Sequence, residues 1–201
     1  MTELEKKLLL SEEDYEHLME HFGYTSQSMR KPIITQINYY FDTDDCSMNR
    51  EDITCRVRLK DGKYKGMMKQ HIQDSDRSTE TEMAVHDGIV SNAFTDMGLK
   101  LQGELITERC IILQDGICEV VLDKNKYLGY TDFELEIEYA PTFEHHAERV
   151  LNMLTGCLID NATSLATQNA NNYVPHVPSK SKRFFERYFS NERRGLYESS
   201  T

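Results

Sequence analysis

Residues 53–69 read ITCRVRLKDGKYKGMMK, and their arrangement decides the fold. Two runs with alternating side chains, 53–59 and 64–69, flank the tetrapeptide Lys60-Asp61-Gly62-Lys63. Asp-Gly between two alternating runs is the strongest short-range signal for a β-hairpin, because both central positions of such a tight turn need positive φ angles. The stretch therefore predicts two antiparallel strands.

Six further segments have the period-two alternation, or the β-branched and aromatic enrichment, of strands. They are residues 2–10, 33–41, 78–85, 105–113, 117–122 and 133–139. A second Asp-Gly pair, Asp115-Gly116, predicts another hairpin between two of them. Eight strands, mostly in hairpins, favour an α+β or barrel-like antiparallel protein over a doubly wound one.

Helical spacing of apolar residues predicts helices between these strands. Ser11 is expected to cap the first helix, with Asp14 three residues later, and Gly23 to end it. The other helices are expected over 90–97, after Pro141, and over 181–189. We assign no structure to the polar stretch 160–178. A single domain is predicted over 1–190, followed by a flexible tail over 191–201.

The bulk composition indicates a soluble protein. Its 201 residues carry a formal net charge of −11, which argues against nonspecific binding of nucleic acid. No apolar run approaches the roughly 20 residues that span a bilayer. The acidic N-terminus lacks the layout of a signal peptide, so a cytoplasmic location is expected. Any anion site must be a local cluster of Lys and Arg.

Cysteine and histidine give no clear signal. The five cysteines are an odd number and include no Cys-x-x-Cys pair, which argues against a disulfide framework and against a zinc site. His145-His146 has no metal-type spacing to another ligand.

The absence of a Gly-rich loop after a strand sets aside the P-loop and dinucleotide-binding folds.

Charged residues recur at every second position of several predicted strands, so each set shares one face of the sheet. These sets are Glu3, Glu5 and Lys7; Arg56, Arg58 and Lys60; Lys63, Lys65 and Lys69; Glu80 and Glu82; and Glu134, Glu136 and Glu138. Two interpretations stay open: solvated outer faces, or the lining of a barrel covered outside by helices. An interior of this kind suits a metal–polyphosphate complex, because carboxylates bind Mg²⁺ or Mn²⁺ and Arg and Lys bind phosphate oxygens.

Glu3-Leu4-Glu5-Lys6-Lys7 matches Glu-x-Glu-x-Lys, the N-terminal signature of the CYTH domain or triphosphate tunnel metalloenzyme superfamily. Further segments resemble the family's motifs in the same order along the chain. They are Tyr40-Phe41-Asp42-Thr43, Arg56-Val57-Arg58, Lys69, Glu80-Thr81-Glu82, Arg109, Asp123 ahead of Tyr127-Leu128-Gly129, Glu134-Leu135-Glu136-Ile137-Glu138 and Ser181-Lys182. The chain resembles small bacterial members of this superfamily over residues 2 to about 190.

The resemblance implies an eight-stranded antiparallel β tunnel, or barrel, with helices packed outside. It also implies a site for one or two divalent metals, Mg²⁺ or Mn²⁺, beside a site for a small-molecule triphosphate. The implied metal ligands are Glu3, Glu5, Glu134, Glu136 and Glu138. The implied substrate-binding residues are Lys7, Arg56, Arg58, Lys69, Arg109 and Lys182. Glu80, Glu82 and Asp123 are implied as supporting residues, and Glu3, Glu5, Lys7 and Arg109 as the catalytic centre.

The activity that this resemblance implies is hydrolysis of a linear triphosphate, in which a metal-activated water attacks a terminal phosphoryl group. Inorganic tripolyphosphate is expected before thiamine triphosphate, because no base-recognition element is visible. The alternatives are a class IV-type adenylate cyclase and a non-catalytic polyphosphate-binding module. Thr107 stands where many relatives carry a second basic residue, and Arg77 is one position further from Glu80 than usual. Lys60, Lys63 and Lys65 are interpreted as surface residues.

Overall fold

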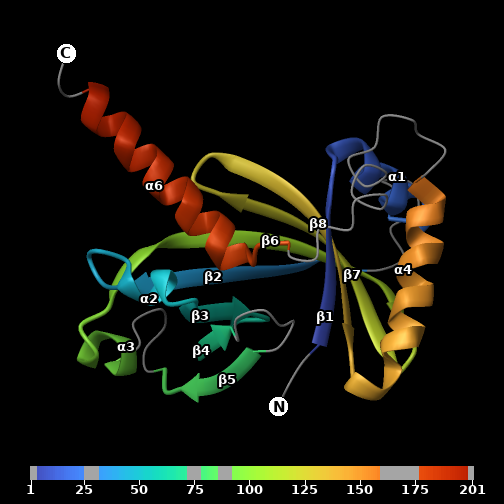
Figure 1. Ribbon diagram of the computed structural model, residues 1–201, viewed down its shortest axis with the longest axis horizontal. Coiled ribbons are helices and arrows are strands. Elements are labelled where there is room, and N and C mark those ends of the chain that lie inside the picture. The colour runs from blue at the N-terminus through green and yellow to red at the C-terminus, as the bar shows by residue number, and fades with distance from the viewer. Residues whose placement is uncertain (1–3, 25–31, 72–77, 86–91, 159–176, 199–201) are drawn as a thin grey trace.

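The eight strands of the described residues belong to one antiparallel sheet (Figure 1). The computed structural model describes residues 4–24, 32–71, 78–85, 92–158 and 177–198. The strand order is β1-β8-β7-β6-β2-β3-β4-β5. The strands are β1 (Leu4–Leu10), β2 (Ile34–Asp42), β3 (Ile53–Lys60), β4 (Lys63–His71), β5 (Ser78–Met83), β6 (Lys100–Gln114), β7 (Cys118–Tyr127) and β8 (Tyr130–Tyr139). The α+β fold with eight antiparallel strands is confirmed.

Tight turns set the register of two hairpins. Asp61 and Gly62, between β3 and β4, have φ angles of 51° and 72°, as the Asp-Gly signal requires. Leu128 and Gly129, between β7 and β8, have φ angles of 47° and 74°. This second turn was missed, and β7 and β8 are longer than predicted. Their ends carry polar side chains such as Asn125 that point inward and interrupt the apolar pattern.

Among the described residues, the helices lie between and after the strands. They are α1 (Glu12–His21), α2 (Ser47–Arg50), α3 (Asn92–Asp96), the 3₁₀ turn η1 (Pro141–Phe143), α4 (Glu144–Leu158) and α6 (Lys180–Glu198). Ser11 caps α1 as predicted, because its Oγ accepts a hydrogen bond from the Asp14 backbone N at 3.0 Å. Helix α6 runs nine residues beyond position 189, where the predicted helix ends. The division of the chain into domains stays a prediction.

Helices α1 and α4 cover the outer face of β1, β7 and β8 (Figure 1). The apolar side chains between them are fully buried, among them Leu18 from α1, Leu135 and Ile137 from β8, and Leu154 from α4. Burying each such side chain contributes roughly 1.5–3 kcal/mol. With this face occupied by the core, the alternate residues of the same strands point to the other face of the sheet.

Helix α6 packs by its first turns against the sheet beside β2 and β6 and then extends away from it (Figure 1). Phe184 and Phe185 are buried there with Tyr40 and Leu105, and the rings of Tyr40 and Phe184 are 4.9 Å apart. Gly103 permits this approach, since a Cβ at that position would lie 2.8 Å from Phe184 Cζ. The start of α6 is thereby fixed at the inner face of the sheet.

Every strand contributes a side chain to one cavity, so the sheet curls around its charged face. The edge strands of the sheet are β1 and β5, and no hydrogen-bonded pairing between them occurs among the residues that the structure describes. Closure of the tunnel stays a prediction. Over the same residues, no helix is both long and apolar enough to cross a membrane.

Candidate metal and phosphate site

The cavity has a volume of about 280 Å³ and is lined mainly by charged side chains. The period-two pattern explains this, because each strand turns its charged residues to the same face. The predicted site residues that line the cavity are Glu5, Lys7, Arg56, Arg58, Lys69, Glu80, Arg109, Glu136 and Glu138. The interpretation of these charged faces as an interior is therefore the one that the geometry supports.

Three carboxylates form a row across neighbouring strands of this cavity. Glu5 on β1 lies directly opposite Glu138 on β8, and Glu138 lies directly opposite Glu119 on β7. Like charges in such cross-strand positions destabilise a sheet unless a cation lies between them. Although burial acts to raise it, the charges of Lys7, Lys69 and Lys180 lower the pKa of Glu5 to about 2. Glu5 is therefore ionised at neutral pH and available to a cation.

Lys7 and Arg109 lie beside this row and contact the next carboxylate along β8, Glu136. Lys7 Nζ is 2.9 Å from Glu5 Oε1 and 3.4 Å from Glu136 Oε1. Arg109 Nη2 donates to Glu136 Oε2 at 2.6 Å, and Nη1 lies 3.7 Å from Glu138 Oε1. Burial and the neighbouring Asp123 and Glu5 raise the pKa of Glu136 despite the two cations. Carboxylates and cations alternate here at contact distance.

A second group of carboxylates lies deeper and surrounds an ammonium group. Asp123, Glu134 and Glu136 each place an oxygen within 4.8 Å of the others. Lys180 Nζ lies 2.9 Å from Asp123 Oδ2 and 2.9 Å from Glu136 Oε1, and it also contacts Glu134. Burial, with Lys7 and Arg109 nearby, lowers the pKa of Lys180. The spacing resembles a metal site, but a lysine of this chain already fills its centre.

Arg183 holds the other side of Glu134. Its Nη2 donates to Glu134 Oε2 at 2.6 Å, and its Nε donates to Asp132 Oδ2 at 2.9 Å. Glu134 was expected among the metal ligands, but both of its oxygens contact cations and it does not line the cavity. Asp123, expected as a supporting residue, is also fully buried and holds Arg109.

The basic residues of β3 differ from those of β1 and β6 in their partners. Arg58 Nε donates to Asn38 Oδ1 at 2.8 Å, and Arg56 Nη2 lies 3.5 Å from the sulfur of Met67. Neither arginine forms an ion pair with a carboxylate among the described residues. Burial and the charges of Arg56 and Arg109 lower the pKa of Arg58 to about 9. These two guanidinium groups lack the negative charge that a phosphate would bring.

Lys69 and Glu80 also line the cavity, where Lys69 Nζ lies 3.3 Å from Glu80 Oε1. Two other predicted residues lie outside it. Lys182 is half exposed and its Nζ lies 3.5 Å from Asp52 Oδ1. Glu82 is exposed and pairs with Lys65. Glu3 falls outside the described residues.

Sequence reasoning missed Lys180 and Glu119, which both line the cavity. Lys60, interpreted as a surface residue, is exposed, and its side chain also borders the cavity. Residues 179–182 contain two Ser-Lys pairs, and the family resemblance was assigned to the second pair, Ser181-Lys182. Lys180 and Lys182 are two positions apart on α6, about 200° around the helix, so only one of them can face the cavity. Lys180, from the first pair, faces the cavity. Ser181, from the second pair, also lines it, and its Oγ lies 2.6 Å from Thr54 Oγ1 on β3. Thr107 is buried and donates to Asn125 Oδ1 at 2.8 Å.

Comparison with known proteins found a matching family model, a relative and solved structures of similar fold. The CYTH domain model matches residues 1–165. The Bacillus subtilis protein named "Putative triphosphatase YjbK" is 27% identical over 157 residues, which are 71% of this chain and 80% of that protein. A Bacillus halodurans structure named a "putative adenylate cyclase" is 24% identical with a TM-score of 0.62, covering 91% of this chain and 97% of that one.

A plant protein gives a further structural match. It is HpAC1 from Hippeastrum, named a "putative adenylyl cyclase" and described as revealing a dominant triphosphatase activity. It is 18% identical with a TM-score of 0.55, and the match covers 79% of this chain and 86% of that one. Because both solved structures are less than 25% identical to this chain, they support the fold alone.

Proposed function

Because this chain belongs to the CYTH domain family, we propose that it is a metal-dependent hydrolase of a linear triphosphate, with inorganic tripolyphosphate as the preferred substrate. One observation carries the proposal. The same cavity holds a row of carboxylates with the donor chemistry for a hard cation and two arginines, Arg56 and Arg58, with no carboxylate partner among the described residues. A metal–triphosphate complex brings the charges that each of these groups needs.

The carboxylate row fits Mg²⁺ or Mn²⁺, which bind through oxygen. Glu5 and Glu138 are direct cross-strand neighbours whose repulsion a cation would relieve, and Glu136 follows Glu138 at the next inward position. We propose these three as metal ligands together with Glu3. Glu134 is left out because Lys180 and Arg183 hold its oxygens. The bound metal would neutralise phosphate charge and activate a water molecule.

The basic residues would bind and orient the phosphate chain. Arg56 and Arg58 can each offer a planar fork of N–H donors to phosphate oxygens. Lys7 and Arg109 already contact a carboxylate proposed for the metal, so they would lie beside a metal-bound phosphate. In phosphoryl transfer, charge spreads over the equatorial oxygens, and fixed cations stabilise it. The chain supplies this stabilisation without a side-chain nucleophile.

The cavity lining favours an inorganic substrate. Tyr40 is the one aromatic side chain among the lining residues that the structure describes, and it is 1% exposed. Its ring packs against Phe184, so it offers no free face on which a base could stack. The remaining lining side chains are charged or polar apart from Met67. We therefore expect the polyphosphate chain, and not an attached nucleoside or thiamine, to provide the binding energy.

The test measures orthophosphate release from tripolyphosphate, thiamine triphosphate and ATP, each with Mg²⁺ or Mn²⁺. We expect the fastest release from tripolyphosphate and a loss of about 100-fold in the Glu5→Gln variant. Glu12→Gln, at an exposed position of α1, is the matched control and should retain activity. Cyclic AMP formed from ATP would indicate a cyclase instead. Tight binding of tripolyphosphate without turnover under all these conditions would indicate a binding module.

A further inference from the structure

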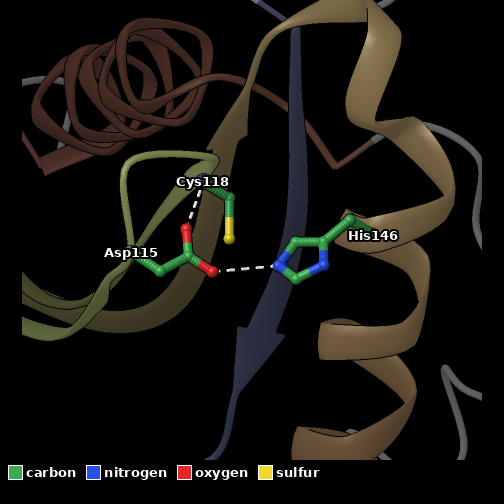
Figure 2. Close-up of side chains that lie close together, drawn as sticks. All are labelled: Asp115, Cys118 and His146. Atoms are coloured by element: carbon green, nitrogen blue, oxygen red, sulfur yellow. Dashed lines mark hydrogen bonds and ion pairs between the residues drawn. The ribbon is translucent and has the colours of Figure 1, made fainter.

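Three side chains of metal-ligand type meet outside the cavity, where the β6–β7 turn contacts α4 (Figure 2). Asp115 lies in the turn, Cys118 begins β7, and His146 lies in the first turn of α4. One ligand atom from each lies within 4.8 Å of the other two. His146 Nε2 is 3.0 Å from Asp115 Oδ2, and the Cys118 thiol points toward both groups (Figure 2).

These separations suit a tetrahedral cation. Zinc bonds to N, O and S ligands are about 2.0–2.3 Å long, which puts neighbouring ligand atoms about 3.5 Å apart. Asp115 Oδ2 and His146 Nε2 are 3.0 Å apart, slightly closer than this separation. All three ligand atoms lie within 4.8 Å of one another, slightly farther than it. Small side-chain rotations are enough to bring the three atoms to bonding distance of one ion.

The fold holds two of the ligands in place and leaves the site accessible. Asp115 Oδ1 accepts hydrogen bonds from the backbone N atoms of Ile117 at 2.8 Å and Cys118 at 2.9 Å, which leaves Oδ2 for a cation. The side chains of Asp115 and His146 are 30% and 27% exposed, whereas Cys118 is buried beneath them. A cation can therefore enter from solvent, and a water molecule can complete its coordination.

We propose that Asp115, Cys118 and His146 form a second cation site, selective for Zn²⁺ and similar borderline ions and distinct from the tunnel. Thiolate and imidazole ligands favour such ions over Mg²⁺. The tunnel instead offers carboxylate oxygens, and no cysteine lines it among the described residues. Binding displaces the thiol proton of Cys118 to solvent, and the ion joins the β6–β7 turn to α4. The site was missed because its ligands come from an Asp-x-x-Cys turn and a distant helix.

The neighbouring charges define what the ion must displace. Because the ion binds the thiolate form of Cys118, binding strengthens as pH rises. Arg149 Nη2 lies 3.4 Å from His146 Nδ1, and its positive charge opposes a cation. When Nε2 binds the ion, Nδ1 carries the proton, and the exposed Arg149 side chain must turn away. Replacing Arg149 with Gln should therefore tighten binding.

The experiment titrates the reduced, chelator-treated protein with Co²⁺ and records the thiolate-to-cobalt charge-transfer band. We expect a charge-transfer band in the wild-type protein, and addition of Zn²⁺ should abolish it. The Cys118→Ser variant should show no band. The His146→Gln variant should bind Co²⁺ with at least 10-fold lower affinity. Zn²⁺ should also raise the Tm of the wild type but not of His146→Gln. Because His146 is partly exposed, the His146→Gln variant should fold, and it tests the site even if Cys118→Ser misfolds.

Two matched controls lie on the same helix. His145→Gln, at a side chain that is 94% exposed, and Cys157→Ser should both keep the band. The Glu5→Gln variant should keep it as well, which separates this site from the tunnel. Absence of a band, or a band that depends on Cys157 and not on Cys118, would overturn the proposal. Failure of the triphosphatase assay would not affect it.

Discussion

Arg109 donates from Nε and Nη2 to the two carboxylate oxygens of Asp123, at 2.9 and 2.7 Å. Both oxygens of this fully buried carboxylate are thereby engaged, and Lys180 contacts one of them. The paired geometry fixes the plane of the guanidinium and leaves its Nη2 and Nη1 directed to Glu136 and Glu138. Asp123 thus orients the arginine that borders the proposed metal ligands.

The first prediction concerns Asp123→Asn. Burial acts to raise the pKa of Asp123, but Lys180 and Arg109 lower it from 3.8 to about 2. A lowered pKa means that the ionised carboxylate stabilises the fold above about pH 4, and that this stability is lost as pH falls toward 2. The free energy of unfolding of the variant should be about 3–5 kcal/mol lower than that of the wild type at neutral pH, since two buried cations lose their partner. Urea unfolding across this pH range measures the effect.

The difference between wild type and Asp123→Asn should shrink as the pH falls from 4 toward 2, because the wild-type carboxyl then becomes neutral as well. Asp44→Asn is the control, since Asp44 is exposed and pairs only with exposed Lys100 among the described ion pairs. It should leave the pH dependence unchanged. A constant difference between wild type and Asp123→Asn across the range would contradict the role given to the carboxylate.

The second prediction compares Lys180→Met with Lys182→Met. Lys180 is 9% exposed and lies among three carboxylates at the cavity, whereas Lys182 is half exposed and faces Asp52. Lys180→Met should lower kcat for tripolyphosphate by about 100-fold, the usual effect of removing one charge-stabilising donor. Lys182→Met should leave kcat and KM unchanged. Equal losses in the two variants would contradict the assignment.

The sequence predicted what depends on local pattern. Period-two charges identified the inner face, and Asp61-Gly62 identified a turn whose φ angles are both positive. It did not identify what depends on tertiary contacts. The choice between Lys180 and Lys182 is made by the packing of Phe184 and Phe185 against the sheet, which fixes the rotation of α6. No local pattern contains that information.

Glu134 illustrates the same limit. It shares a face with Glu136 and Glu138, so the strand period groups all three as metal ligands. The structure separates Glu134 because Arg183 and Lys180, one helical turn apart on α6, reach its two oxygens. Residues so distant in sequence meet only after α6 has docked. Glu119 was missed for a simpler reason: it is a single acidic residue in a strand whose other charged inner position is Asp123.

The third prediction is that Arg58→Met removes substrate binding without destabilising the protein. Arg58 is half-buried, and burial with Arg56 and Arg109 nearby lowers its pKa to about 9, so its charge is disfavoured until an anion binds. The unliganded variant should have a Tm close to that of the wild type, because relief of this charge repulsion offsets the hydrogen bond lost to buried Asn38. Tripolyphosphate should raise the Tm of the wild type and not that of the variant. Thermal unfolding with and without ligand measures both effects.

Arg50→Met is the matched control for Arg58→Met. Arg50 is an exposed arginine of α2 whose pair with Asp45 is at the surface. Its replacement should preserve the Tm rise that tripolyphosphate causes in the wild type. If Arg58→Met showed the same ligand-induced rise, the arginines of β3 would not be the phosphate-binding residues.

The fourth prediction concerns the docking of α6. A Cβ at Gly103 would lie 2.8 Å from Phe184 Cζ and 3.3 Å from its Cε2, too close for the ring to stay in place. Gly103→Ala should therefore destabilise the protein by about 1–3 kcal/mol, the usual effect of overpacking. Because displacing Phe184 also displaces Lys180 on the same helix, kcat for tripolyphosphate should fall. Chemical denaturation and the phosphate-release assay measure the two effects.

Gly156→Ala provides the opposite expectation for the same chemical change. Gly156 lies within α4, and a Cβ there would meet no atom within 4 Å. Alanine in a helix interior should stabilise the protein by up to about 1 kcal/mol, since glycine loses more backbone entropy on folding. Activity should be unchanged, because α4 lies on the outer face of the sheet. Normal activity in a destabilised Gly103→Ala protein would show that α6 packing and the position of Lys180 are not coupled.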